Sequence, residues 1–315
     1  MGFILALAAL LLIIVPFYFP PYQVFMATEI IIFALFAVSY NMLLGSAGLL
    51  SFGHAMFFGT GAYVTAVSSE HLKSLPIYGV VILAVIATMI IGFMIGCLLL
   101  KHKGSYFALL TLAFNALFYA IATKWDTVTG GDDGLIVTRS ELGFGITSFS
   151  MSDIKPFYFF TLIFIGAVIL FCYYFTRTAM GKTVLLMREN EERMKFLGYN
   201  TNTARLILFT FTASLAGCAG SFYALCFEFA SISAIEIDMT TTVLLITFIG
   251  GTGTFWGPIL GAVVYICLQD FLSDITDRWP LIMGMIFIIM VLYIPKGLSG
   301  LCLEIKDKFS KNTPS

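Results

Sequence analysis

The sequence predicts an all-α, polytopic membrane protein, a transmembrane helical bundle of about ten spans that includes short or broken helices. Hydrophobic residues make up 59% of the 315-residue chain and charged residues only 11%, and the mean hydropathy is +0.97. Soluble domains carry about 25% charged residues, so 17 basic and 18 acidic side chains are too few to cover this chain in water. We therefore expect one transmembrane domain over residues 1–315.

Ten apolar stretches are long enough, or nearly long enough, to cross a bilayer. They cover residues 3–19, 24–44, 52–67, 77–100, 105–123, 157–175, 206–227, 239–250, 256–269 and 281–295. Residues 52–67 and the pair within 239–269 fall short of the roughly 20 residues of a spanning helix. Broken or re-entrant helices are expected there, and eight full spans plus one irregular pair is the alternative.

The distribution of Lys and Arg supports ten crossings with both termini in the cytoplasm. Under this topology, most of the 17 basic residues face inside: Lys101, Lys103, Arg177, Lys182, Arg188, Arg193, Lys195, Arg205, Lys296, Lys306, Lys308 and Lys311. The loop with Asp132 and Asp133 then faces outside, and the loop with Arg188 faces the cytoplasm. Residues 1–19 are interpreted as a span, because they lack the basic region and cleavage pattern of a secretory signal.

Several function classes are disfavoured by the composition. A net charge of -1 gives no basic field for nucleic acid, and the six cysteines have no spacing that indicates a metal site. The predicted spans contain essentially no charged residue apart from Glu29 near an outer end, whereas ion-coupled carriers normally keep buried charges. Gly181-Lys182-Thr183 ends like a phosphate-binding loop but lacks its first glycine, so no enzyme active site is predicted.

Two glycine-dense segments, 41–66 and 248–262, join short apolar pieces on the predicted inner side. Glycine permits breaks and close backbone approach, as a helix that lines a transport path requires. The candidate path residues are Asn41, Gly45, Gly48, Gly53, His54, Gly59, Gly61, Asn115, Gly250, Gly251, Gly253 and Gly257. Tight helix packing explains the glycines as well. A hydrogen-bonded packing role is the alternative for His54, and the two amides could only tie neighbouring helices together.

The longest inside loop, about 177–205, alternates charged and apolar residues at helical spacing. Its apolar stripe comprises Val184, Leu185, Met187, Met194, Phe196 and Leu197. A protein without its own energy site needs a contact for an external motor, so we interpret this loop as a cytoplasmic coupling segment. The candidate coupling residues are Gly181, Arg188, Glu189, Asn190, Glu191 and Gly198. An amphipathic helix lying on the membrane is the alternative.

Four segments together resemble a known family. They are YNMLLGSAGLLSFGHAMFFGTGAY at 40–63, KGSYFALLTLAFN at 103–115 with TGGDDGL at 129–135, the run 181–224 that begins GKTVLLMRENEER, and GGTGTFWGPILGA at 250–262. In order, spacing and membrane context they resemble the permease subunits of ABC importers for branched-chain amino acids, the LivM-like branch. The sequence departs from that pattern at Met187 and 191–195, where family members usually have smaller residues.

The resemblance implies a multi-pass inner-membrane permease that moves branched-chain amino acids inward and binds no cofactor itself. It implies four kinds of partner: a second related permease, two cytoplasmic ATPases that hold ATP and Mg, an extracytoplasmic substrate-binding protein, and membrane lipid. Similar systems carry urea or short amides, which remain alternatives. From the residues alone, an ion-coupled secondary carrier of a neutral solute or a membrane scaffold also stays open.

Overall fold

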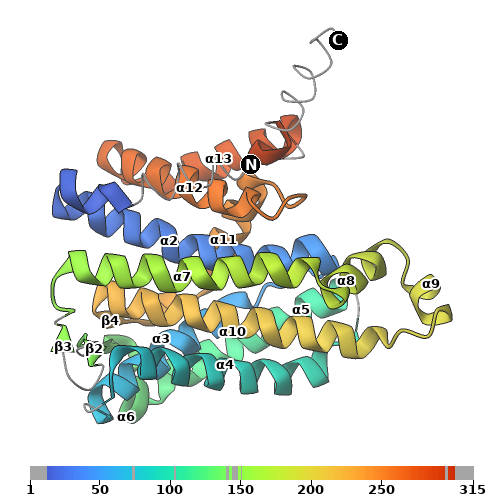
Figure 1. Ribbon diagram of the computed structural model, residues 1–315, viewed down its shortest axis with the longest axis horizontal. Coiled ribbons are helices and arrows are strands. Elements are labelled where there is room, and N and C mark those ends of the chain that lie inside the picture. The colour runs from blue at the N-terminus through green and yellow to red at the C-terminus, as the bar shows by residue number, and fades with distance from the viewer. Residues whose placement is uncertain are drawn as a thin grey trace, which may run out of the picture.

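The computed structural model describes residues 13–72, 75–102, 104–139, 142–143, 148–149, 151–294 and 297–301, and these residues fold mainly as helices running along one long axis (Figure 1). The α-helices from α2 onward are α2 Pro21–Asn41, α3 His54–His71, α4 Ile77–Leu99, α5 Ser105–Lys124, α6 Asp126–Thr129, α7 Ile154–Arg177, α8 Ala179–Glu189, α9 Glu191–Phe196, α10 Thr201–Phe227, α11 Ile237–Gly250, α12 Gly257–Ile275 and α13 Trp279–Tyr293. The π-helix η1 Met42–Ser46, the 3₁₀ turns η2 Gly131–Asp133 and η3 Ile232–Ala234, and the strands β1 Leu135–Ile136, β2 Leu142–Gly143, β3 Ser148–Phe149 and β4 Phe229–Ala230 complete the elements.

The prediction of a polytopic helical membrane protein is confirmed. Seven helices within the described residues are long and apolar enough to cross a membrane: Pro21–Ser46, Ile77–Leu99, Ser105–Lys124, Ile154–Arg177, Thr201–Phe227, Gly257–Ile275 and Trp279–Leu301. The predicted short stretches become the 18-residue α3 and the 14-residue α11. Most of the first predicted span, residues 3–12, lies outside the described residues.

Proline sets the start of several of these helices. Pro21, Pro258 and Pro280 occupy the first or second helical position, where the missing N–H costs no hydrogen bond. Pro76 is the extended N-cap residue of α4. The apolar runs that follow then need no amphipathic pattern, because both lipid and neighbouring helices accept apolar side chains.

Helices α2 and α10 form the centre of the bundle. In their most apolar stretches 78% and 72% of residues are buried, whereas α7 reaches 17% and the last span 12%. α10 packs against α3, α4 and α2, and α2 packs against α7, α11 and α12. Figure 1 shows α10 between α7 and α4, with α12 and α13 on the far side of α2. The peripheral helices therefore form the outer surface of the bundle.

The two ends of the bundle carry different structures. We call the end with α6 and strands β1 and β4 the loop end, and the end with α8 and α9 the coupling end; Figure 1 shows them at opposite ends of the long axis. β1 pairs antiparallel with β4, with Leu135 opposite Ala230. Residues 132 and 188 thus belong to opposite ends, as the predicted topology requires.

The chain re-enters the bundle between β4 and α11. Asn115, the eleventh residue of the 20-residue α5, donates a 2.8 Å hydrogen bond from Nδ2 to the backbone oxygen of Ile235. A Cβ at Gly59 would collide with Ile235, so this segment also packs against α3. α11 therefore starts level with the middle of α5, which explains why 14 residues suffice to reach the coupling end. The chain thus crosses the bundle as an irregular segment followed by a short helix, which is the broken one of the two expected alternatives for a short apolar stretch.

Candidate functional site

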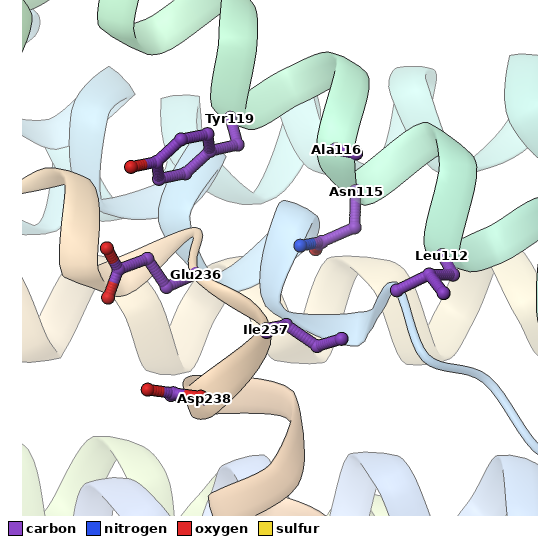
Figure 2. A pocket seen from close by; sticks show the side chains of 7 residues that line it. All are labelled: Leu112, Asn115, Ala116, Tyr119, Glu236, Ile237 and Asp238. Atoms are coloured by element: carbon purple, nitrogen blue, oxygen red, sulfur yellow. The ribbon is translucent and has the colours of Figure 1, made fainter.

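A cavity of about 430 Å³ lies between α5 and the start of α11. Its lining residues come from two short stretches: Leu112, Asn115, Ala116 and Tyr119 on α5, and Glu236, Ile237 and Asp238 at the α11 N-terminus. Figure 2 shows the two carboxylates and the Tyr119 hydroxyl directed to the same side of the cavity. The volume falls in the range of roughly 300–1,000 Å³ typical of small-molecule sites.

Asn115 is the one predicted path residue among those that line this cavity. The residue is 3% exposed, and Nδ2 fixes the segment before α11 through the backbone oxygen of Ile235. Oδ1 has no hydrogen-bond partner within the described structure. A buried amide oxygen normally finds a donor, so the tying role predicted for this residue uses the nitrogen of its amide and not the oxygen.

Glu236 and Asp238 were missed by the sequence analysis, which placed both in an outside loop because the apolar run begins only at Met239. The structure brings them level with the middle of α5 through the Asn115 contact. No sliding hydropathy window detects this, because the depth of a polar residue next to a short apolar run depends on tertiary packing. The short length of the apolar stretch at 239–250 was the one feature of the sequence that indicated a deep start for this helix.

Asn41 ties the π-helix region to the second glycine-dense segment. Its Nδ2 donates to the backbone oxygen of Thr254 at 3.1 Å, and Oδ1 has no partner among the described residues. Thr254 Oγ1 in turn donates to Ser299 Oγ at 2.9 Å. The two segments that the sequence analysis singled out are therefore joined by a side chain, at the coupling end of α2.

Most of the predicted path glycines are at close helix contacts. An added Cβ would meet backbone atoms of a neighbouring segment at Gly45, Gly53, Gly59, Gly61, Gly250 and Gly257. Gly48 and Gly251 have positive φ angles of 69° and 103°, which favour glycine for a different reason. An added Cβ at Gly253 would meet nothing within 4 Å. The contacts favour the packing interpretation for the first group.

His54 is fully buried. Its Nε2 lies 2.9 Å from Ser39 Oγ, and its ring stacks on Phe36 at a centroid distance of 5.7 Å. Nδ1 has no partner among the described groups. His54 does not line the cavity between α5 and α11, so its surroundings favour the hydrogen-bonded packing role over contact with a solute there.

A smaller cavity of about 110 Å³ lies between α2 and α12. Glu29 and Asp270 both line it, and the Tyr22 hydroxyl donates to Asp270. The sequence analysis ended the apolar stretch at residue 269, but α12 continues to Ile275. This helix therefore carries Asp270 within its length. In the described part of the chain, no group of three or more His, Cys, Asp or Glu is arranged to hold a metal.

The predicted coupling segment forms the two short helices α8 and α9. Thr178 caps α8 by accepting from Gly181 N at 3.4 Å, and Asn190 caps α9 by accepting from Arg193 N at 2.9 Å. Gly198 ends α9 with a φ of 84°. Three of the candidate coupling residues thus have positions set by helix capping and chain reversal.

The charged candidates in this segment differ in whether they bond to the rest of the bundle. Arg188 Nη1 donates to the backbone oxygen of Gly45 at 2.5 Å, so α8 is attached to η1. Glu191 bonds Arg205 on α10 at 2.5 Å and Lys195 at 3.1 Å. Glu189 is exposed. Arg188 and Glu191 therefore hold the segment to its own bundle, and Glu189 is free to meet another protein.

The apolar stripe also divides. Val184, Met187 and Met194 are buried in the core of the chain, whereas Leu185, Phe196 and Leu197 are exposed, with Phe196 at 91%. Leu186 on α8 and Tyr199 after α9 are exposed as well. An exposed apolar patch of this kind next to charged residues is typical of a protein contact. We call these five exposed residues the apolar patch of the coupling segment.

Comparison with known proteins gives one consistent family. The model of the branched-chain amino acid transport system permease component matches residues 22–294. The high-affinity branched-chain amino acid transport system permease protein LivM of Salmonella typhimurium is 27% identical over 316 residues, covering 93% of this chain and 74% of that protein. The probable LivM protein of Methanocaldococcus jannaschii is 23% identical, covering 83% and 88%.

A shorter similarity connects the chain to a different transport system. The autoinducer 2 import system permease protein LsrC of Klebsiella pneumoniae is 34% identical over 92 residues, 28% of this chain. No solved structure matches. Because the family model covers most of the chain and agrees with the helical membrane fold, this protein belongs to the family of branched-chain amino acid transport permease components, which are transport subunits and not enzymes.

Proposed function

We propose that this chain is the membrane subunit of an ATP-driven importer that moves leucine, isoleucine and valine into the cell. The family match over residues 22–294 carries the proposal, and the LivM proteins are the relatives that cover most of the chain. ATP and Mg bind to separate ATPase subunits in this proposal. The transport path is shared with a second, related permease, and an extracytoplasmic binding protein delivers the amino acid.

The apolar patch of the coupling segment supports the ATPase contact. Phe196 is the most exposed of the large apolar side chains, and α9 projects from the coupling end in Figure 1. A large apolar side chain surrounded by charged residues resembles the anchor of a protein interface. The coupling end accordingly faces the cytoplasm in this proposal, in agreement with the distribution of Lys and Arg.

Two variants test the ATPase contact. Phe196→Ser should reduce co-purification of the ATPase subunits, because it removes the anchor without burying a new group. Glu192→Gln, an exposed residue on the same helix, is the control and should assemble normally. Full assembly of Phe196→Ser would contradict the placement of the ATPases at this patch.

The substrate is tested by competition in reconstituted vesicles that contain the complete importer. Uptake of radiolabelled leucine should be inhibited by unlabelled isoleucine and valine and unaffected by urea or a short amide. Uptake of radiolabelled urea or of a radiolabelled short amide by the same vesicles, with no uptake of leucine, would assign the protein to a sister system and contradict the proposed substrate.

A further inference from the structure

The cavity between α5 and α11 combines two carboxylates with an apolar wall. Glu236 and Asp238 line it without an ion pair to any described residue, and no Lys or Arg is among its lining residues. Leu112, Ala116 and Ile237 supply the apolar wall. A site with this composition fits a ligand that has a cationic group and an aliphatic part.

Glu236 and Asp238 have no basic partner among the described residues although they lie deep along the bundle. They are level with the middle of α5, because Asn115 holds the neighbouring Ile235 there. On this chain Glu236 is half-buried and Asp238 is exposed. Acidic side chains level with the middle of a membrane-spanning helix normally pair with a partner or mark a pathway. Both acids stand at the N-terminus of the 14-residue α11, and this end of a helix dipole attracts negative charge. Neither acid forms an ion pair within the described residues, so a cationic partner for them has to come from outside the described part of this chain.

Asn115 supplies an independent observation at the same cavity. The residue is only 3% exposed. Its Nδ2 donates to the backbone oxygen of Ile235, and its Oδ1 has no hydrogen-bond partner among the described residues. Figure 2 shows the Asn115 amide directed toward the segment that carries Glu236 and Ile237. The unused oxygen is an acceptor, and a ligand with N–H donors would satisfy it.

We propose that this cavity binds the ammonium group of the transported amino acid, with Glu236 and Asp238 as ionic partners and Asn115 Oδ1 as a hydrogen-bond acceptor. The inference rests on the proposed function and deepens it. The aliphatic side chain of the amino acid packs against Leu112 and Ile237, and its carboxylate points away from the two acids, toward the mouth of the cavity. An inorganic cation such as Na⁺ shares the ionic chemistry but lacks the N–H donors and the aliphatic group.

Thiol protection tests binding directly, without relying on transport. Ala116 is exposed at the cavity wall, so Ala116→Cys is introduced into the complete importer in a background without native cysteines. A cationic methanethiosulfonate should modify the new thiol faster than an anionic one of similar size. Leucine should slow that modification, whereas 4-methylpentanoate, which lacks the ammonium group, and Na⁺ should not. Equal rates for both reagents, or equal protection by 4-methylpentanoate or Na⁺, would overturn the proposal.

Transport by charge-neutral variants gives the second readout. The double variant Glu236→Gln with Asp238→Asn should lower leucine uptake about tenfold, the loss expected for one charge-assisted contact, while thermal unfolding and assembly with the ATPases stay unchanged. Asp133→Asn, an exposed acid at the loop end, is the control. Normal uptake by an assembled double variant would refute the ammonium site. Absence of leucine uptake by the unmodified importer would instead refute the proposed function.

Discussion

Arg139 fastens the loop end of the bundle to the end of α10. Its guanidinium donates to the backbone oxygens of Leu225 at 2.8 Å and Cys226 at 2.9 Å, pairs with Glu228 at 3.2 Å and lies over the Phe157 ring at 4.4 Å. Cations near a helix C-terminus satisfy its free carbonyl groups. One side chain thus connects the loop after α6, the start of α7 and the end of α10.

Replacing Arg139 should be costly for stability. Arg139→Met keeps the length of the side chain but leaves the α10 carbonyl groups and Glu228 without a donor, so we expect a loss of about 2 kcal/mol. Thermal unfolding of the purified protein in detergent measures it as a lower melting temperature. Lys182→Met, an exposed residue on α8, is the control. Equal melting temperatures for the two variants would contradict the fastening role.

The glycine-dense segment 250–257 contains a matched pair of positions. A Cβ on Gly250 would meet the backbone of Gly257 and Pro258, whereas one on Gly253 meets nothing within 4 Å. Gly250→Ala should therefore lower stability by about 1–3 kcal/mol through overpacking, and Gly253→Ala should stay within about 0.5 kcal/mol. Melting temperatures and the yield of monodisperse protein separate the two outcomes; tolerance of Gly250→Ala would argue against close packing there.

At the residue scale, the sequence identified the glycine-rich positions but could not assign their roles. Gly61 and Gly253 are alike in sequence, yet a Cβ at the first would collide with Gly217 and the second faces open space. Only the neighbouring segment distinguishes them. Asn115 shows the same limit, because its amide was recognised as a tie or a path residue and the structure gives its nitrogen the first role.

At the element scale, α8 is attached to the π-helix η1. Arg188 donates to the Gly45 backbone oxygen, and a Cβ at Gly48 would lie 3.2 Å from Arg188 Cγ. Asn41, the residue before η1, continues the connection to Thr254. π-helical turns often occur at functional positions, and this one joins the coupling segment to the loop between α11 and α12.

We expect this connection to transmit movement of the docked ATPases. Arg188→Met should leave ATPase subunits bound, because the apolar patch is unchanged, but should lower uptake per ATP hydrolysed. Co-purification, hydrolysis and leucine uptake are measured on the same vesicles, with Glu189→Gln as the exposed neighbouring control. Unchanged uptake per ATP in Arg188→Met would show that this hydrogen bond only stabilises the fold.

Long elements were predictable and short irregular ones were not. The stretches 77–100, 105–123 and 206–227 agree closely with α4, α5 and α10, because about 20 apolar residues leave few alternatives to a spanning helix. The irregular segment before α11 was expected only as part of a broken or re-entrant helix. Its depth depends on the side chain of Asn115 on another helix, which hydropathy along one segment does not contain.

At the scale of the whole molecule, the predicted topology can be tested by labelling. Single cysteines at Asp133 and Glu189, both exposed, are placed in a background without native cysteines. Because the loop end and the coupling end are opposite (Figure 1), a membrane-impermeant reagent should label Asp133→Cys in intact cells and Glu189→Cys only after permeabilisation. Labelling of both in intact cells would contradict this orientation.

The central claim is that transport by this chain is driven by ATP on partner subunits. The direct measurement is leucine uptake into two kinds of vesicle. One contains this chain alone, and the other contains the chain with its second permease, ATPases and binding protein. Uptake is measured in each with and without ATP, and with and without an imposed ion gradient. We predict uptake only in the complete assembly with ATP, independent of the ion gradient. Gradient-driven uptake by the chain alone would contradict the account and identify a secondary carrier.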